Sequence, residues 1–227
     1  MQVFRLHGEL AMRMTYLGAA AALALAVSTP AFATIVIDVG PGVLQPDENL
    51  LFTNNPTPGT TIQGITNQSD SLLSISGGEI LVGDGGQARV EAQTGTIDST
   101  FTYRGRTGQT LGFDFLDPAL SFTSTEFRIF GGTATQLVLT FVDTEGEVFT
   151  STLAAPPNGF FNARAIDGQR IDYFSIAANG TIGDVRQIRV GGVGSAAVPE
   201  ATTWALMILG FGGAGAMLRR RRERFAS

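Results

Sequence analysis

Apolar and polar residues alternate in short segments through the middle of the chain. The alternation is clear at residues 111–115, which read LGFDF, and at 125–130. There Phe127 and Ile129 fall on one face, and Glu126 and Arg128 fall on the other. A period of two residues is typical of a β-strand that buries one face. Outside the two ends of the chain, no segment has the 3.6-residue period of an amphipathic helix. The pattern therefore predicts a mainly β protein.

Short strands of this kind recur between turn residues. They are predicted at 35–39, 71–75, 79–82, 89–92, 101–104, 111–115, 125–130, 137–142, 148–153, 170–176 and 185–190. Gly, Asn and Asp separate them, and Gly146 lies in a predicted hairpin turn. Many short strands with regular turn signals favour an antiparallel β-sandwich, which we expect to be jelly-roll-like.

Two segments of the middle region do not have a strand pattern. Residues 43–66 contain Pro46, Pro56 and Pro58, and we expect a long loop or an irregular edge there. Residues 191–197 consist of small residues and one valine, which predicts a flexible linker. The sequence thus delimits a β-sandwich body at residues 34–190 and a linker behind it.

The N-terminal segment, residues 1–33, has the three parts of a secretory signal peptide. Arg13 precedes an apolar run at residues 17–27, which is predicted to form a signal helix. Ala31 and Ala33 place small residues at the two positions that define a cleavage site. We expect the secretion machinery to export the chain and signal peptidase to cut after Ala33. The alternative is a signal anchor that is not cleaved.

The C-terminal segment, residues 198–227, has a second ordered set of signals. In order, it carries Pro199 and Glu200, then Trp204 and Ala205, an apolar run at 206–218, and the cluster Arg219, Arg220, Arg221 and Arg222. Proline interrupts regular structure, and tryptophan suits a membrane–water interface. Arginine clusters stay on the cytoplasmic side of a membrane. We therefore expect a hydrophobic helix stopped in the inner membrane by its arginines, with the body outside.

This tail resembles the PEP-CTERM sorting domain in its PEPxxWA variant. Pro199, Glu200, Trp204 and Ala205 occupy the motif positions, and Ala201 departs from the pattern because the family has proline there. The resemblance implies that an exosortase-type transpeptidase cuts at the motif. It also implies transient residence in the inner membrane and final delivery to the cell surface or beyond. A permanent tail anchor is the alternative.

The composition of the body excludes several kinds of active site. The chain has no Cys and only one His, His7, which lies within the predicted signal peptide. All fifteen basic residues are Arg, so the body also lacks Lys. Ser-His-Asp triads, Cys nucleophiles, Lys Schiff bases and His-based zinc sites are therefore unavailable to it. No nucleotide-binding motif is present, so we expect no cofactor and no enzyme activity.

The charge of the body indicates which partners suit it. Residues 34–198 contain 17 acidic residues and 8 Arg, which leaves a net charge near −9. An acidic body disfavours nucleic acid, because phosphate binding needs a basic surface.

Some residues of the body could still bind a ligand or an ion. Asp143, Glu145 and Glu147 are weak candidates for a calcium site, since calcium needs only oxygen ligands. A simple hairpin turn is the preferred interpretation, because Glu145 and Gly146 suit such a turn.

Aromatic residues suggest carbohydrate as a second kind of ligand. Tyr103, Tyr173 and Phe160 could stack on sugar rings, although burial in the core is the simpler interpretation. A glycosidase would need two carboxylates facing each other across a cleft. The candidate residues for such a pair are Asp84, Glu91, Asp114 and Asp117.

Together these patterns predict an exported, non-enzymatic protein of the cell surface or the extracellular matrix. The alternative is a β-sandwich module that binds carbohydrate, such as extracellular polysaccharide, and a carboxylate-dependent glycosidase is the third hypothesis.

Overall fold

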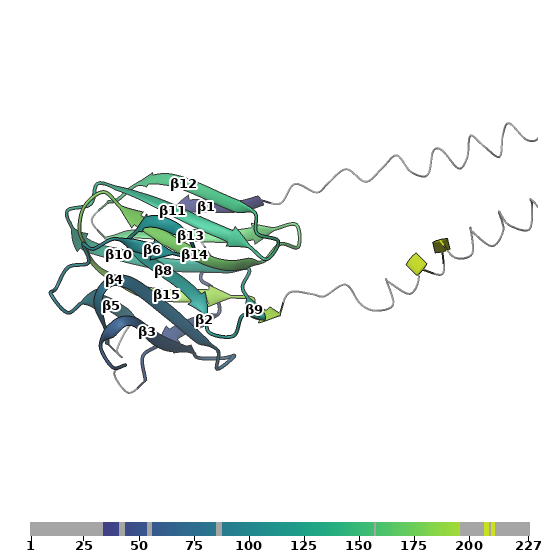
Figure 1. Cartoon of the computed structure of the whole chain (residues 1–227), viewed down its shortest axis with the longest axis horizontal. Helices are drawn as coiled ribbons and strands as arrows, with labels where there is room; N and C mark the ends of the chain where they lie inside the picture. Colours follow the sequence, from purple (N-terminus) through teal and green to yellow (C-terminus); the bar gives the residue numbers. More distant parts are fainter. Residues whose placement is uncertain are drawn as a thin grey trace, which may run out of the picture. The chain divides into compact units, whose positions relative to one another are not determined.

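The computed structural model describes residues 34–40, 44–53, 56–84, 88–156, 158–195, 207, 208, 210 and 211. Antiparallel β-structure dominates this part of the chain (Figure 1). The prediction of a mainly β protein is therefore confirmed. Met207, Ile208, Gly210 and Phe211 are helical, which agrees at these positions with the predicted C-terminal helix. The N-terminal signal segment lies outside the described residues.

Sixteen strands are present in the described residues. They are β1 (Thr34–Val39), β2 (Glu48–Leu51), β3 (Gly59–Thr66), β4 (Leu72–Asp84), β5 (Arg89–Ala92), β6 (Phe101–Tyr103), β7 (Arg106–Gln109), β8 (Leu111–Phe115), β9 (Leu120–Ser121), β10 (Ser124–Gly132), β11 (Gln136–Asp143), β12 (Val148–Ala154), β13 (Gly159–Ile166), β14 (Ile171–Ala178), β15 (Ile182–Gly191) and β16 (Gly194–Ser195).

Twelve of these strands form one continuous antiparallel sheet. Its order is β1-β13-β10-β15-β2-β3-β4-β8-β14-β11-β12, and β5 pairs with both β15 and β4. Five of the strands close into a small barrel through the pairs β15–β2, β2–β3, β3–β4, β4–β5 and β5–β15. Two arms extend from it, β10-β13-β1 on one side and β8-β14-β11-β12 on the other. The short pairs β6–β7 and β9–β16 are separate.

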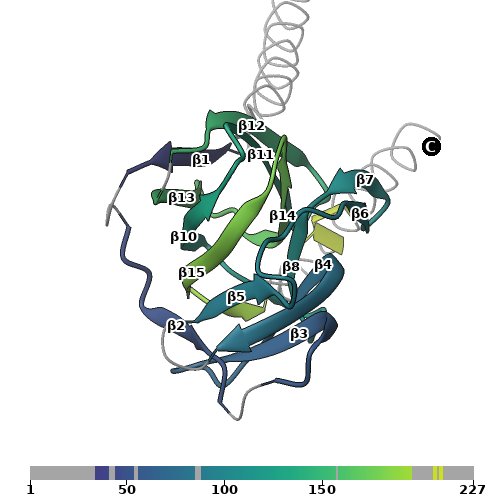
Figure 2. The ribbon, with the colours of Figure 1, turned by 90° about the vertical axis from the view of Figure 1, so that its left-hand side faces the viewer.

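Stacked phenylalanines pack the two arms against each other, and Figure 2 shows the arms on opposite sides of the body. Phe174 of β14 lies 4.3 Å from Phe113 of β8 and 5.5 Å from Phe127 of β10, measured between ring centroids. Phe161 of β13 stacks on Phe127 at 5.7 Å, and Phe141 of β11 stacks on Phe174 at 5.3 Å. All five are fully buried, and each contributes about 2 kcal/mol by its burial.

The connectivity differs from the jelly-roll-like sandwich that the sequence predicts. A sandwich consists of two separate sheets, whereas here one hydrogen-bonded network passes through a closed barrel from one arm to the other. Alternating residues mark a strand but do not determine its partners. The long-range pairing therefore could not be read from the pattern.

The predicted loop at residues 43–66 is also corrected. It contains β2 and β3, which complete the barrel. Pro46, Pro56 and Pro58 fall between or before these strands rather than within them, so proline removes no donor from the ladder. Likewise, the predicted strands at 71–75 and 79–82 are one strand, β4, which continues through Gly77 and Gly78. Glycine suits position 78 because a Cβ there would lie only 3.0 Å from the backbone of Ser99.

Candidate functional site

The residues of the sorting tail lie almost entirely outside the described part of the chain. This applies to Pro199, Glu200, Trp204 and Ala205, to the predicted cleavage residues Ala31 and Ala33, and to Arg219, Arg220, Arg221 and Arg222. Within the described residues, no helix has the length and apolar character that crossing a membrane requires.

The segment that leads to the tail is held on the body as far as Ser195. Gly191 is the last residue of β15, and Gly194 and Ser195 pair with Ser121 and Leu120 of β9. The segment predicted as a flexible linker is thus strand or tight turn over 191–195. Gly192, with φ of 62°, makes the turn between the two strands, and glycine adopts this left-handed conformation without strain.

Arg170, just before β14, fastens this segment to the body. Its Nε donates to Ser121 Oγ at 2.6 Å, and its Nη2 donates to the backbone oxygens of Ser121 at 2.7 Å, Gly192 at 2.6 Å and Gly194 at 3.0 Å. Burial lowers the pKa of Arg170, although an arginine remains charged throughout the physiological range. One side chain therefore joins β9, the turn and β16.

The outer face of the neighbouring strands β13, β10 and β15 carries a row of alternating arginine and phenylalanine side chains. Arg128 lies directly opposite Arg186 on one neighbouring strand and Phe160 on the other. The Arg186 guanidinium lies 4.3 Å from the Phe130 ring centroid. The Arg128 guanidinium lies 5.6 Å from Phe130 and 5.1 Å from Phe160. Such cation–π contacts hold the guanidinium groups in fixed positions.

Only one of the two arginines in this row has an acidic partner at close range. Arg186 donates from Nε and Nη2 to Asp184 at 2.6 and 2.7 Å. Arg89 of β5 donates to the same carboxylate at 3.1 Å. Within the described residues, Arg128 makes no ion pair, and its buried Nε has no hydrogen-bond partner. Arg128 is thus the guanidinium of the row available to an anionic group.

Next to this row lies a buried carboxylate with incomplete hydrogen bonding. Glu126 is 2% exposed and lies opposite both Asn162 and Arg189. Its Oε1 is 3.6 Å from Arg189 Nη1. Among the described residues, Glu126 Oε2, Asn162 Oδ1 and Arg189 Nε have no partner. Buried polar atoms are costly when unpaired, so an ordered water or ligand group would stabilise this cluster.

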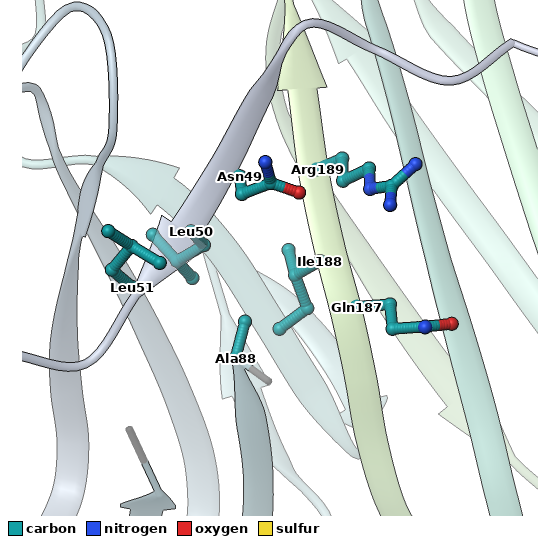
Figure 3. Close-up of a pocket in the computed structure, with 7 residues that line it drawn as sticks. All are labelled: Asn49, Leu50, Leu51, Ala88, Gln187, Ile188 and Arg189. Carbon is teal, nitrogen blue, oxygen red and sulfur yellow. The ribbon is translucent and has the colours of Figure 1, made fainter. Parts of the chain in front are cut away.

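A small pocket lies in the wall of the barrel, between β2 and the start of β5. Its volume is about 210 Å³, and its lining is Asn49, Leu50, Leu51, Ala88, Gln187, Ile188 and Arg189 (Figure 3). Figure 3 shows Ile188 on the β2 side of β15, with Gln187 and Arg189 extending to the other side. The volume is below the 300–1,000 Å³ that is usual for drug-sized ligands. The pocket therefore suits only a small group.

The predicted sugar-stacking residues do not form one platform. Tyr103 of the β6–β7 hairpin packs edge to face on Tyr173 of β14 at 5.8 Å, and Tyr173 is buried. Phe160 lies in the Arg128 row on the opposite arm. It belongs to β13. Burial is the first cause that raises the pKa of Tyr103, and the nearby Asp114 carboxylate is the second.

Asp143, the central calcium candidate, stabilises its own turn. Its Oδ1 accepts from the backbone N–H groups of Glu145 and Glu147 at 2.9 and 2.8 Å, and its Oδ2 accepts from Gln169 Nε2 at 3.0 Å. The side chains of Glu145 and Glu147 are exposed. No group of three or more potential metal-binding side chains occurs among the described residues.

The four carboxylates considered for a glycosidase have separate surroundings. Glu91 pairs with Arg89 on β5, and Asp114 of β8 pairs with Arg104 of the β6–β7 hairpin. Asp117 accepts from the backbone N–H of Ala119, and Asp84 is the exposed last residue of β4. These contacts do not place any two of them as a pair facing a common cleft.

Sequence reasoning missed Arg170 and the Arg128 row. The alternation at residues 125–130 does place Arg128 and Phe130 together on the face opposite to Phe127 and Ile129. Their neighbours Phe160 and Arg186 come from strands about thirty and sixty positions later in the chain. No local signal connects them, because only strand pairing brings them together.

Comparison with known families identifies the C-terminal segment. Residues 197–222 match the PEP-CTERM protein-sorting motif. This confirms the resemblance predicted from Pro199, Glu200, Trp204 and Ala205. The chain carries a PEP-CTERM sorting motif, and such a motif implies export, sorting towards the cell surface and an exosortase as processing partner. No curated protein and no solved structure matches the chain.

Proposed function

We propose that this chain is an exported, non-enzymatic protein of the cell surface or the extracellular matrix, released from the inner membrane by exosortase processing. The observation that carries the proposal is the PEP-CTERM motif at residues 197–222. The predicted signal peptide at 1–33 supports it, because it supplies the export step that must come before processing.

The architecture of the body supports a structural or display role. One antiparallel network surrounds a core of stacked phenylalanines. Strand pairing continues as far as Ser195, shortly before the matched motif. The chain contains no cysteine, so the stability of this body comes from its core and its hydrogen bonds rather than from disulfides.

The intact mass of the protein from envelope and medium fractions of its host tests this proposal. We expect a chain that starts at Thr34 and ends near Pro199, with or without an added group. A mass that retains Trp204 and the residues after it would mean a permanent anchor and would contradict the processing step.

A second candidate function is binding of an acidic glycan, and the Arg128 row favours it. Arg128 has no acidic partner in the described residues, and Phe130 is 36% exposed beside it. A planar guanidinium binds a carboxylate or sulfate through two parallel hydrogen bonds. Glu126 and Asn162 beside the row are 2% and 1% exposed, so contact with a glycan would come from Arg128 and the ring of Phe130.

Retention on immobilised acidic and neutral polysaccharides distinguishes this candidate from a purely structural role. We expect Arg128→Ala to weaken retention on the acidic polymer roughly tenfold, which corresponds to loss of one charge-assisted contact. Arg104→Ala, in the β6–β7 hairpin, is the matched control. Equal retention of the wild type on acidic and neutral polymers, or no effect of Arg128→Ala, would eliminate the candidate.

A further inference from the structure

The Arg170 contacts hold the described part of the chain on the body as far as Ser195, close in sequence to the sorting motif. We call the turn and strand at residues 191–195, together with Arg170 and Ser121, the exit clasp. Between Ser195, its last residue, and Pro199 of the motif there are only three residues. Four residue steps span at most about 14 Å. Without the clasp, the chain would leave the sheet after Gly191, the last residue of β15, and eight steps would reach roughly 28 Å.

The clasp is built from several independent contacts, so it differs from a chance surface contact. The Arg170 guanidinium faces three carbonyl oxygens and a hydroxyl, all of them neutral. Ser121 Oγ donates in turn to the oxygen of Gly194 at 3.1 Å. The Gly191 oxygen accepts from Thr123 N–H at 2.8 Å and from Thr123 Oγ1 at 3.1 Å. Ser121 itself is 1% exposed.

The sequence within the clasp would be vulnerable if it were free. Residues 191–195 read GGVGS, which is small, polar or flexible at almost every position. Exposed segments of such residues are preferred sites of proteolytic nicking. A protease hydrolyses the peptide bond with one water molecule, leaving a new carboxylate and a new amine, so a cut here would separate the body from its sorting tail before the motif is used.

We infer that Arg170 is a positioning residue for sorting: by closing residues 191–195 onto the body, it protects them from cleavage before the sorting motif is used. This inference rests on the proposed function. Arginine suits the task because its planar guanidinium places the Nε and Nη2 donors in fixed directions, whereas lysine carries its three donors on a single nitrogen. A protease cuts a closed segment at a rate set by the fraction of molecules in which the segment is open. Weakening the clasp raises this fraction, and the cleavage rate rises in proportion.

Limited proteolysis of the full-length protein in detergent, followed by mass spectrometry, tests the inference directly. The probe is an elastase, which cuts beside small residues. We expect Arg170→Ala to raise the rate of cuts within 191–195 roughly tenfold, as expected when several hydrogen bonds are removed from a local opening. Arg164→Ala, which removes an exposed arginine of β13, is the control and should leave this rate unchanged.

Further measurements exclude an effect through misfolding. Arg170→Lys keeps the charge and the aliphatic stem, and should give intermediate nicking with an unchanged melting temperature. In the host, Arg170→Ala should yield more body ending at 191–195 and less ending at the motif.

Equal nicking of wild type and both Arg170 variants within 191–195 would overturn the inference. Failure of the proposed function has a different signature, since the wild-type tail would then stay uncut in the host while the proteolysis result in detergent still held.

Discussion

The ring of Tyr103 lies directly over Gly112, so that a Cβ at Gly112 would be only 2.5 Å from three carbon atoms of the ring. Glycine at this position allows the β6–β7 hairpin to cover the outer face of β8 and β14. The same contact places Arg104 over the ring of Tyr173, at 5.2 Å from its centroid, and beside Asp114, with which it forms an ion pair.

Replacing Gly112 by alanine should therefore displace the hairpin. We expect a loss of about 1–3 kcal/mol in the free energy of unfolding, the range of overpacked sites, measured by urea denaturation. Gly59→Ala is the control, because a Cβ there has no neighbour closer than 3.4 Å. Similar losses for the two variants would argue against the Tyr103 contact as the cause.

Phe174 is the centre of the aromatic core, since it contacts Phe113, Phe127, Phe141 and Phe122. Phe174→Ala should cost about 3–5 kcal/mol, the range found when a buried aromatic side chain is removed. Phe130→Ala, at an exposed position, should cost no more than about 1 kcal/mol. Chemical denaturation of both variants checks the difference, and comparable losses would contradict the core assignment.

Asp143 should matter through its turn rather than through calcium. Asp143→Ala removes the acceptor for the N–H groups of Glu145 and Glu147 and should cost about 2–3 kcal/mol. Asp143→Asn keeps one oxygen acceptor and should cost less. The melting temperature should be the same in millimolar calcium and in EDTA. A rise with calcium that Glu145→Gln abolishes would instead support the ion site.

Asp172 gives stability a defined dependence on pH. Burial, followed by the neighbouring Asp114 carboxylate, raises the pKa of Asp172 above its ordinary value. The folded state therefore binds the proton more tightly than the unfolded state. This favours folding at low pH, and the contribution is lost as pH rises from the ordinary pKa through the raised one.

Asp172→Asn should accordingly stabilise the protein at pH 7, by about 0.5 kcal/mol because the group is partly solvated and its charge is screened. The gain should disappear below about pH 3.5, where aspartate is protonated in both states. Melting temperatures of both proteins from pH 3 to 7 check this. A gain of constant size over the whole range would show that the charge is not the cause.

The sorting motif should be required for release from the membrane. Pro199→Ala combined with Glu200→Ala should leave the tail uncut and hold the protein in the inner-membrane fraction, as seen by fractionation and intact mass. Thr202→Ala, within the matched segment but at a variable motif position, is the control. Surface delivery of the double variant at the wild-type rate would contradict processing at this motif.

The local pattern of residues determined much about this protein. Alternation at 111–115 and 125–130 indicated β8 and β10, and the turn around Gly146 was recognised as the link between β11 and β12. The tail was recognised from Pro199 and Trp204, because a linear sorting signal consists of a few residues at fixed spacing.

Only the tertiary structure decided which strands pair. It closed β2 and β3 into a barrel where the prolines suggested a loop, and it separated Phe160 from Tyr103. It also placed Arg128 beside Phe160 and Arg170 against Gly194. The physical reason is that a period of two residues reports burial of one face, whereas the partners of a strand depend on contacts between residues far apart in the chain.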